Sequence, residues 1–142
     1  MAVYTQVGAE DMAAFLDLYG VGPLKSAKGI AEGVENSNYL VDTAAGRFIL
    51  TLYEKRVDER DLPFFINLID HLAESGSPVP RILPDLSGQH VQTLCGRPAC
   101  LIQFLDGVSV SRPTGRQAYA AGAALAQMHL AVEDFSEGPP NP

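Results

Sequence analysis

Apolar residues recur along this chain with two different periods, and the change from one to the other predicts a mixture of helices and strands. Residues 10–19 carry apolar side chains at i, i+3, i+4 and i+7, one face of a helix, with Gly20 as a stop signal. Residues 61–75 and 116–132 repeat the helical spacing. We therefore predict three helices, at residues 10–19, 61–75 and 116–132.

Short apolar runs bounded by glycine, proline and asparagine lie between these helices and predict strands. In residues 47–54 both faces are largely apolar, so we expect this strand in the middle of a sheet, covered on both sides. The order is helix, three strands, helix, two strands, helix. The predicted strands are residues 24–34, 38–43, 47–54, 90–94 and 99–105, and residues 82–83 begin another.

The turn at residues 33–38, Gly-Val-Glu-Asn-Ser-Asn, is the most informative segment for function. Glycine and asparagine tolerate positive φ and leave backbone N–H groups uncovered in a tight bend. Such a bend can bind phosphate oxygens. An ordinary hairpin turn is the alternative reading of the same residues.

Composition limits the possible functions. The chain has 142 residues, 46% hydrophobic and 19% charged, which suits one domain with a core. Ten basic and 17 acidic residues give a net charge of −7, which argues against non-specific nucleic-acid binding but not against a nucleotide. Cys95 and Cys100 are expected to be reduced thiols without a zinc site, and the absence of a leader or long apolar run predicts a cytoplasmic protein.

Four segments, taken in order, resemble the N-terminal lobe of the aminoglycoside-phosphotransferase-like kinases, a family of the protein-kinase-like fold. Within that family, two runs are similar to the bacterial homoserine kinases, which act in threonine biosynthesis. The resemblance implies an α+β fold with a five-stranded antiparallel sheet and one inserted helix. It also implies transfer of the ATP γ-phosphoryl group to a small molecule, homoserine. The four segments are residues 33–41, 46–53, 72–80 and 104–107 with 122–129, and the two runs are 28–38 and 49–56.

The resemblance implies a nucleotide site made of three parts. A turn would cover the ATP phosphates, mainly through backbone N–H groups, and a strand residue would line the adenine pocket. A linker would bind the adenine edge through backbone groups of Gln103 and Leu105, with Phe104 flanking the ring; core packing is the alternative for Ile49, Phe104 and Leu105. The implied positions are Gly33, Glu35, Asn36, Ser37, Asn38, Ile49, Thr51, Gln103, Phe104 and Leu105.

The chain departs from the family pattern at the position that usually holds a lysine or arginine for the phosphates. Thr51 stands there, and the helix glutamate that would pair with the cation falls near Phe65. Lys28, Lys55 and Arg56 are candidate replacements, with a solvated cation as the alternative for each. The phosphate charge would then rest on Mg²⁺, whose ligands are expected in a C-terminal lobe.

The catalytic motifs of that C-terminal lobe do not occur in this sequence. No His-Gly-Asp…Asn loop follows the linker, and His129 is expected to be an ordinary helix histidine rather than a general base. We therefore expect residues 1–105 to form the nucleotide-binding lobe, 106–114 the inter-lobe linker, and 115–142 the start of a truncated C-lobe with a disordered tail. By itself, such a chain should be catalytically inactive.

Two alternatives remain open from the sequence. One is a related kinase with choline, an aminoglycoside or a sugar as acceptor, since the acceptor pocket belongs mostly to the C-lobe. The other is a non-catalytic binding module. A module should hide the apolar face of its last helix, for example in a dimer, whereas a truncated enzyme should expose that face or swap it with a neighbour. The expected partner is a small molecule, with no nucleic acid and no membrane.

Overall fold

The computed structural model describes residues 3–32, 35–54 and 57–136. The chain divides into two compact units, Met1–Leu62 with Ile82–Phe104, and Pro63–Arg81 with Leu105–Pro142. The predicted boundaries at 1–105, 106–114 and 115–142 remain a prediction, because compactness alone does not define a domain. Within the described part, no helix is both long and apolar enough to cross a membrane.

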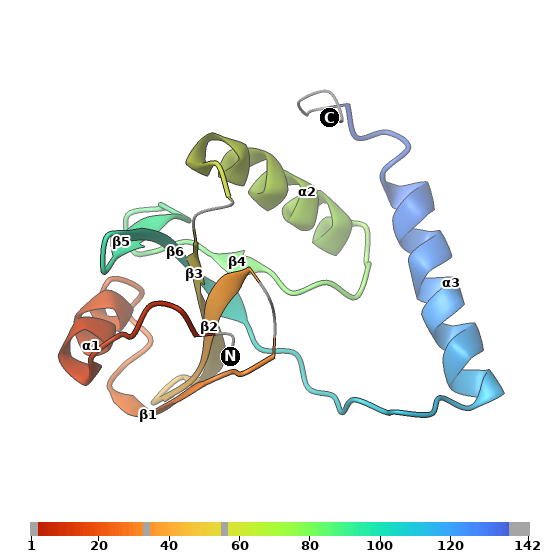
Figure 1. Cartoon of the computed structure of the whole chain (residues 1–142). Helices are drawn as coiled ribbons and strands as arrows, with labels where there is room; N and C mark the ends of the chain where they lie inside the picture. The colour runs from red at the N-terminus through yellow and green to blue at the C-terminus, as the bar shows by residue number, and fades with distance from the viewer. Residues whose placement is uncertain (1–2, 33–34, 55–56, 137–142) are drawn as a thin grey trace. The chain divides into compact units, whose positions relative to one another are not determined.

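An antiparallel sheet forms the frame of the first unit (Figure 1). β3 lies between β2 and β6, the central position that its two apolar faces predicted. The α+β fold class is confirmed. The described residues form six strands rather than five, because the two-residue β4 also pairs with β6. The strands are β1 (Leu24–Gly29), β2 (Asn36–Thr43), β3 (Gly46–Tyr53), β4 (Ile82–Leu83), β5 (Gln92–Leu94) and β6 (Arg97–Gln103), in the order β1-β2-β3-β6-β4 with β5 also on β6.

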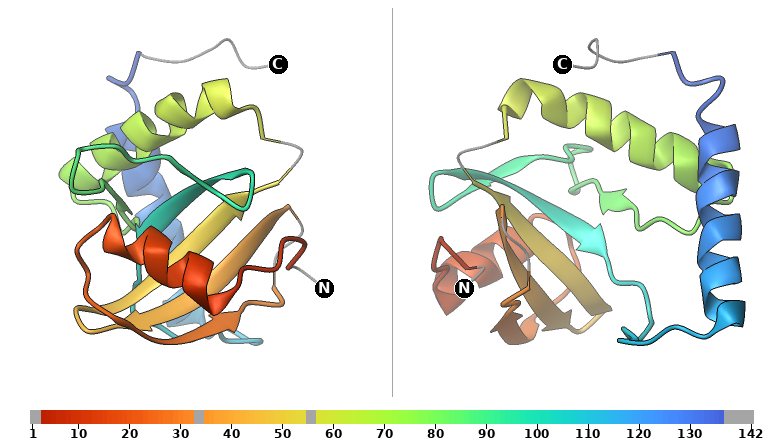
Figure 2. Two further views of the ribbon diagram at one scale, coloured as in Figure 1. Left: turned by 90° about the vertical axis from the view of Figure 1, so that its left-hand side faces the viewer. Right: turned by 45° about the vertical axis from the view of Figure 1, so that its right-hand side comes forward.

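Helix α1 (Ala9–Asp17) covers one face of this sheet (Figure 2). Its apolar stripe buries Met12, Phe15 and Leu16 in a core shared with inward-facing residues of β2, β3 and β6. Removing these side chains from water is the main source of stability in this unit. The strand residues of the core include Tyr39, Val41, Leu50, Leu52, Ala99 and Leu101.

Strand β1 is shorter than predicted. It ends at Gly29 instead of continuing to residue 34, and beyond it the Ile30 N–H still donates to the Asn38 carbonyl at 2.8 Å. On the other side of the sheet from β1, in the turn between β5 and β6, Cys95 and Gly96 adopt φ values of 51° and 72°. A two-residue hairpin with positive φ at both positions matches the twist of its strands, so this turn sets the register of β5 on β6.

Two helices dominate the second unit, α2 (Leu62–Glu74) and α3 (Gly115–Ala131). The first residue of α2, Leu62, belongs to the first unit. α3 begins with a capping box, in which Gln117 N–H donates to Thr114 Oγ1 and Thr114 N–H donates to Gln117 Oε1. No residue of α3 is buried. Of the predicted disordered tail, residues 136–142, all but Ser136 lie outside the described residues.

Before α2, the chain makes a single 3₁₀ turn, η1 (Glu59–Asp61). Asp58 accepts a hydrogen bond from the Arg60 N–H at 3.0 Å. The short side chain of aspartate commonly satisfies the first free N–H groups of a helix in this way. Pro63 follows within the first turn of α2, where its missing N–H costs no hydrogen bond.

Candidate functional site

The predicted site residues on β2 point to two opposite faces of the sheet. Along this strand, burial alternates strictly, with Ser37 and Tyr39 on the α1 side and Asn36 and Asn38 on the other. Successive residues of a strand always alternate in this manner. The predicted phosphate turn therefore continues into a strand that presents two asparagines to one face and a serine to the other.

Asn38 and Thr51 are brought together on the first of these faces. They are register partners on β2 and β3, and the Thr51 hydroxyl donates to Asn38 Oδ1 at 2.7 Å. Thr51 is 5% exposed. Because Oδ1 receives this hydrogen bond, the carboxamide is oriented and its two N–H donors point away from the threonine oxygen. The pair thus forms an oriented, uncharged donor where the family pattern expects a cation.

The groups next to this pair are also uncharged. Cys100 is the partner of Thr51 on β6, and burial raises the pKa of its thiol to about 11, with a hydrogen bond from Tyr53 acting the other way. Burial likewise raises the pKa of the Tyr53 phenol. Asn36, opposite Tyr53, buries its Oδ1 without a hydrogen-bond partner among the described residues. Near neutral pH, these side chains form a neutral polar patch.

An apolar row lies two residues further along the strands on the same face. Leu40 and Ile49 are register partners, and Ile49 also pairs with Ile102 of β6. At about 3.4 Å per residue, the row is roughly 7 Å from the Asn38–Thr51 pair. The face thus combines polar donors near the turn with a flat apolar surface beside them, an arrangement that fits a ligand with one anionic and one aromatic end.

The predicted linker begins at the far end of this face. Gln103 is the last residue of β6, and the half-buried Phe104 ring has the Arg47 guanidinium 6.0 Å from its centroid. Leu105 is 46% exposed. The boundary between the two compact units falls between Phe104 and Leu105. The segment therefore connects the units. The adenine contacts of its backbone stay a prediction.

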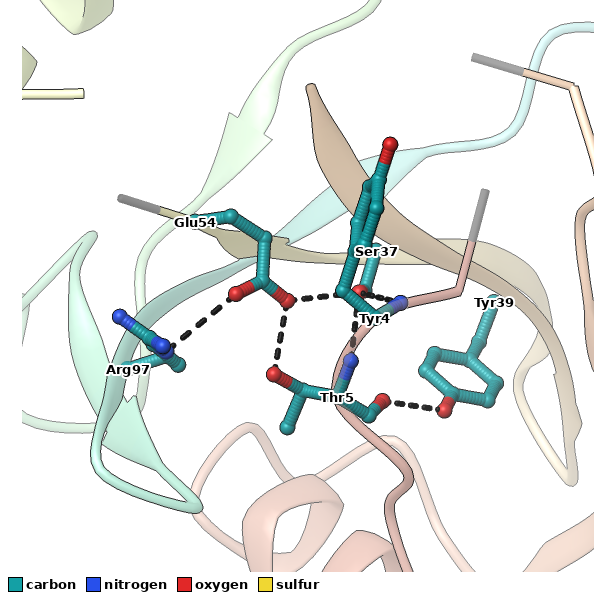
Figure 3. A network of polar contacts seen from close by, with 6 residues as sticks. All are labelled: Tyr4, Thr5, Ser37, Tyr39, Glu54 and Arg97. Carbon is teal, nitrogen blue, oxygen red and sulfur yellow. Dashed lines mark hydrogen bonds and ion pairs between the residues drawn. The ribbon is translucent and has the colours of Figure 1, made fainter. Parts of the chain in front are cut away.

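Ser37 lies on the opposite face, in a buried polar cluster (Figure 3). Its hydroxyl donates to Glu54 Oε1 at 2.7 Å and accepts from the backbone N–H groups of Tyr4 and Thr5 at 2.8 and 3.0 Å. Its side chain is therefore occupied on the α1 side and turned away from Asn38. Any phosphate contact by this residue would have to use its backbone.

Glu54, at the centre of this cluster, carries a stabilised negative charge. Its side chain is 11% exposed, accepts from the Thr5 hydroxyl at 2.7 Å, and has Arg97 Nε 3.3 Å from Oε2. Burial acts to raise the pKa of Glu54, but the hydrogen bonds from Ser37 and Thr5 and the charge of Arg97 outweigh it. The pKa of this carboxyl is therefore lower than usual.

The sequence did not predict the Glu54 cluster, because its members, at positions 5, 37, 54 and 97, are too far apart along the chain to form a local pattern. The alternation of β2 could, however, have separated Ser37 from its two asparagine neighbours. Among the other candidates, Glu35 is exposed at a bend, and Lys28 pairs with Leu40, which places it on the Asn38 face. Gly33, Lys55 and Arg56 lie outside the described residues.

No cluster of metal-binding side chains occurs in the described part of the chain. Residues 3–32, 35–54 and 57–136 contain no group of three or more His, Cys, Asp or Glu side chains placed to hold a metal ion. The Mg²⁺ that accompanies ATP is usually held by one or two carboxylates together with the phosphates and water. The expected location of its ligands in a C-terminal lobe therefore stays a prediction.

Comparison with known proteins agrees with the fold. Residues 26–140 match the model of the phosphotransferase enzyme family (APH). The chain belongs to this family. The substitution of Thr51 for the family's usual cation stays a prediction.

Several homoserine kinases are similar to this chain. The one from Methylorubrum populi is 56% identical over 135 residues, and one from Rhodopseudomonas palustris is 55% identical over 136 residues. These alignments cover 95% and 96% of the chain but 42% of each relative. The chain thus spans less than half the length of the curated relatives it matches.

A solved structure of spectinomycin phosphotransferase, in complex with ADP and spectinomycin, has the same fold over most of this chain. The TM-score is 0.70 at 20% identity, with 95% of this chain and 40% of that chain covered. At this identity the match concerns the fold. The resemblance to the aminoglycoside-phosphotransferase-like kinases is confirmed at the level of family and fold.

Proposed function

We propose that this chain is the nucleotide-binding portion of an ATP-dependent homoserine kinase. The supporting observation is the 53–56% identity to homoserine kinases over 95–100% of the chain. The reaction transfers the γ-phosphoryl group of ATP to the hydroxyl oxygen of homoserine, which loses its proton, and yields ADP and O-phosphohomoserine. The catalytic base and the magnesium ligands would come from outside the described residues.

In this proposal, the Asn38 face binds the nucleotide in a defined direction. Adenine lies against Leu40 and Ile49, with its edge toward the backbone of Gln103 and Leu105. The phosphates then lie toward Asn38, Asn36 and the turn at residues 33–38. The alternation of a polar and an apolar row on one face supports this direction, because a phosphate needs N–H donors and the base needs apolar contact.

The Asn38–Thr51 pair would replace the missing cation with neutral donors. Thr51 holds Asn38 Oδ1, so the carboxamide N–H groups are free to turn toward a phosphate oxygen. A neutral donor contributes less than a charge-assisted one, so more of the phosphate charge must be balanced elsewhere. Binding should therefore tolerate loss of the Thr51 hydroxyl better than a negative charge at position 38.

The test uses a hybrid protein in which this chain replaces the matching 135 residues of the Methylorubrum populi kinase. We expect the hybrid to release ADP in the presence of ATP and L-homoserine, and not with choline or spectinomycin. The unaltered relative is the positive control, and the 142-residue chain alone should give no homoserine-dependent ADP. A folded hybrid without homoserine-dependent ADP release would refute the proposal.

Two variants of the hybrid test the binding direction. Asn38→Asp should raise KM for ATP roughly tenfold or more, the equivalent of about 1.4 kcal/mol, and Thr51→Val should raise it by a smaller factor. KM for homoserine should stay unchanged in both. Asn67→Asp and Thr93→Val, which make the same chemical changes at exposed positions of α2 and β5, are the matched controls.

A further inference from the structure

The Glu54 carboxylate joins three segments that are distant in sequence. It accepts from Thr5 of the N-terminal segment and from Ser37 of β2, both on Oε1, and faces Arg97 of β6 through Oε2. Burying a carboxylate is costly unless it is paired and hydrogen-bonded. Glu54 meets both conditions at 11% exposure, so its charge is kept in a specific arrangement.

Glu54 also determines what the Ser37 hydroxyl can do. A hydroxyl has one proton and two lone pairs. Ser37 gives its proton to Glu54, so both lone pairs are available to the N–H groups of Tyr4 and Thr5. Two residues on, the Tyr39 hydroxyl donates to the Thr5 carbonyl at 2.7 Å and accepts from Val7 N–H at 3.2 Å. Residues 4–7 are thus fastened beneath the start of β2.

Ser37 lies between the two asparagines of the candidate nucleotide face. Its neighbours Asn36 and Asn38 point to the other side of the sheet, and residues 36–38, predicted as the end of the phosphate turn, form the start of β2. Adjacent residues of a strand share one backbone, so an anchor on one face sets the orientation of side chains on the other. Directly beneath the Asn36–Asn38 segment, the strand is therefore held by a hydroxyl oriented by Glu54.

We infer that Glu54 is a positioning residue for nucleotide binding, which acts through Ser37 to hold Asn36 and Asn38 at the phosphate end of the site. The inference rests on the proposed function. A positioning role differs from a simple tether of the N-terminal segment. The Thr5 hydroxyl donates to Glu54, whereas only the Thr5 backbone bonds residues of β2. Loss of the Thr5 hydroxyl should loosen the tether alone, whereas loss of the Glu54 charge should disturb the asparagines.

Kinetics of the hybrid protein separate these two roles. Glu54→Gln should raise KM for ATP about tenfold, since small misplacements of binding groups have large effects, with kcat and KM for homoserine little changed. Ser37→Ala should have the same effect, and the double variant should be no worse than either single one. Thr5→Val, the matched control, should leave KM for ATP within about twofold of the unaltered value. Equal effects of Thr5→Val and Glu54→Gln, or a lower melting temperature with unchanged KM, would overturn the inference.

Amide hydrogen exchange of the 142-residue chain, without any ligand, gives an independent measurement. Glu54→Gln should speed exchange at residues 36–38 at least about tenfold, whereas residues 92–94 of β5 should keep their rates. Unchanged exchange at residues 36–38 would overturn the inference even if the hybrid is active. An inactive hybrid would instead refute the proposed function and leave this exchange result to decide the role of Glu54.

Discussion

Helices α1 and α3 differ in how they are stabilised. α1 has nine residues and buries three of them in the core of the first unit, whereas α3 has seventeen and buries none. Leu125 and Leu130 of α3 are 51% and 67% exposed. Isolated helices shorter than about 12–15 residues are marginal in water, and most helical stability in proteins comes from packing. Length alone therefore says little about which helix is the more firmly held.

Local features support α3 instead. Seven of its residues are alanine, the best helix former, and its first turn is closed by the Thr114–Gln117 capping box. Its last turn meets α2 within the second unit, where His71 Nε2 is 2.6 Å from the Ala131 carbonyl oxygen. The Phe135 ring then lies 5.9 Å from Phe64 and 5.1 Å from His71. α1 is therefore held mainly by tertiary packing, and α3 mainly by its helix propensity and its capping hydrogen bonds.

The largest expected effect comes from emptying the core of the first unit. Leu50 is fully buried, so Leu50→Ala should lower the free energy of unfolding by roughly 3 kcal/mol or more, through lost apolar contact and a residual cavity. Leu125→Ala, the same change on α3, should cost less than about 0.5 kcal/mol. Urea unfolding followed by far-UV circular dichroism measures both. Similar losses for the two variants would contradict the contrast between the packed core of the first unit and the exposed α3.

Ser37→Ala should have the next largest effect. Removing the hydroxyl leaves two backbone N–H groups and one lone pair of Glu54 without their partner inside the protein, which should cost about 2 kcal/mol. The same urea titration measures the loss. Ser26→Ala, the same change at an exposed position of β1, is the matched control. A loss as small as that of Ser26→Ala would show that water replaces the hydroxyl in the cluster.

Acid should weaken the first unit through Glu54. Its folded pKa is depressed, so its contribution to stability is complete at pH values well above about 4.3 and is lost as pH falls through the folded pKa. Among the described residues, Arg97 of β6 and Tyr39 of β2 are the titratable groups that face it, and neither changes charge in this range. The expected loss is smaller than that of Ser37→Ala, since a protonated carboxyl still accepts hydrogen bonds.

Unfolding free energies measured between pH 7 and pH 3 test this dependence. The Glu54→Gln protein should lose less stability over that range than the unaltered chain, because glutamine does not titrate. Parallel pH profiles for the two proteins would mean that other carboxylates account for the acid response.

The smallest effect is expected at the start of α3. Thr114→Ala removes the capping hydroxyl and should destabilise this helix by about 1 kcal/mol. Amide exchange at residues 115–118 should become faster, while the core amides of β3 keep their rates. Thr93→Ala on β5 is the matched control. Faster exchange throughout the first unit would show that α3 is not stabilised locally.

The sequence predicted the elements well where one period dominates a long segment. The helices at 10–19, 61–75 and 116–132 correspond to α1, α2 and α3 with shifts of one or two residues, and the central place of β3 followed from its two apolar faces. Short elements were harder. The two-residue β4 is a strand only because β6 offers it an edge, a long-range condition that no local pattern contains.

The candidate site was predictable in part. Asn38, Thr51 and Ile49 lie on one face because residues two apart on a strand share a side, which the sequence already implies. The hydrogen bond between Asn38 and Thr51 depends on strand register, and Ser37 depends on a partner 17 residues away. Such contacts are not encoded in any single segment, since they form only when the sheet and the N-terminal segment come together.

By itself, the sequence determined the family, the alternation of helices and strands, and the absence of a cation at position 51, because these depend on residue identity and local periodicity. Only the tertiary structure decided that Ser37 and Glu54 form a buried cluster beneath the asparagines. It also decided that Thr51 orients Asn38. Both are pairings between distant segments, whose geometry depends on backbone register and burial rather than on any local preference.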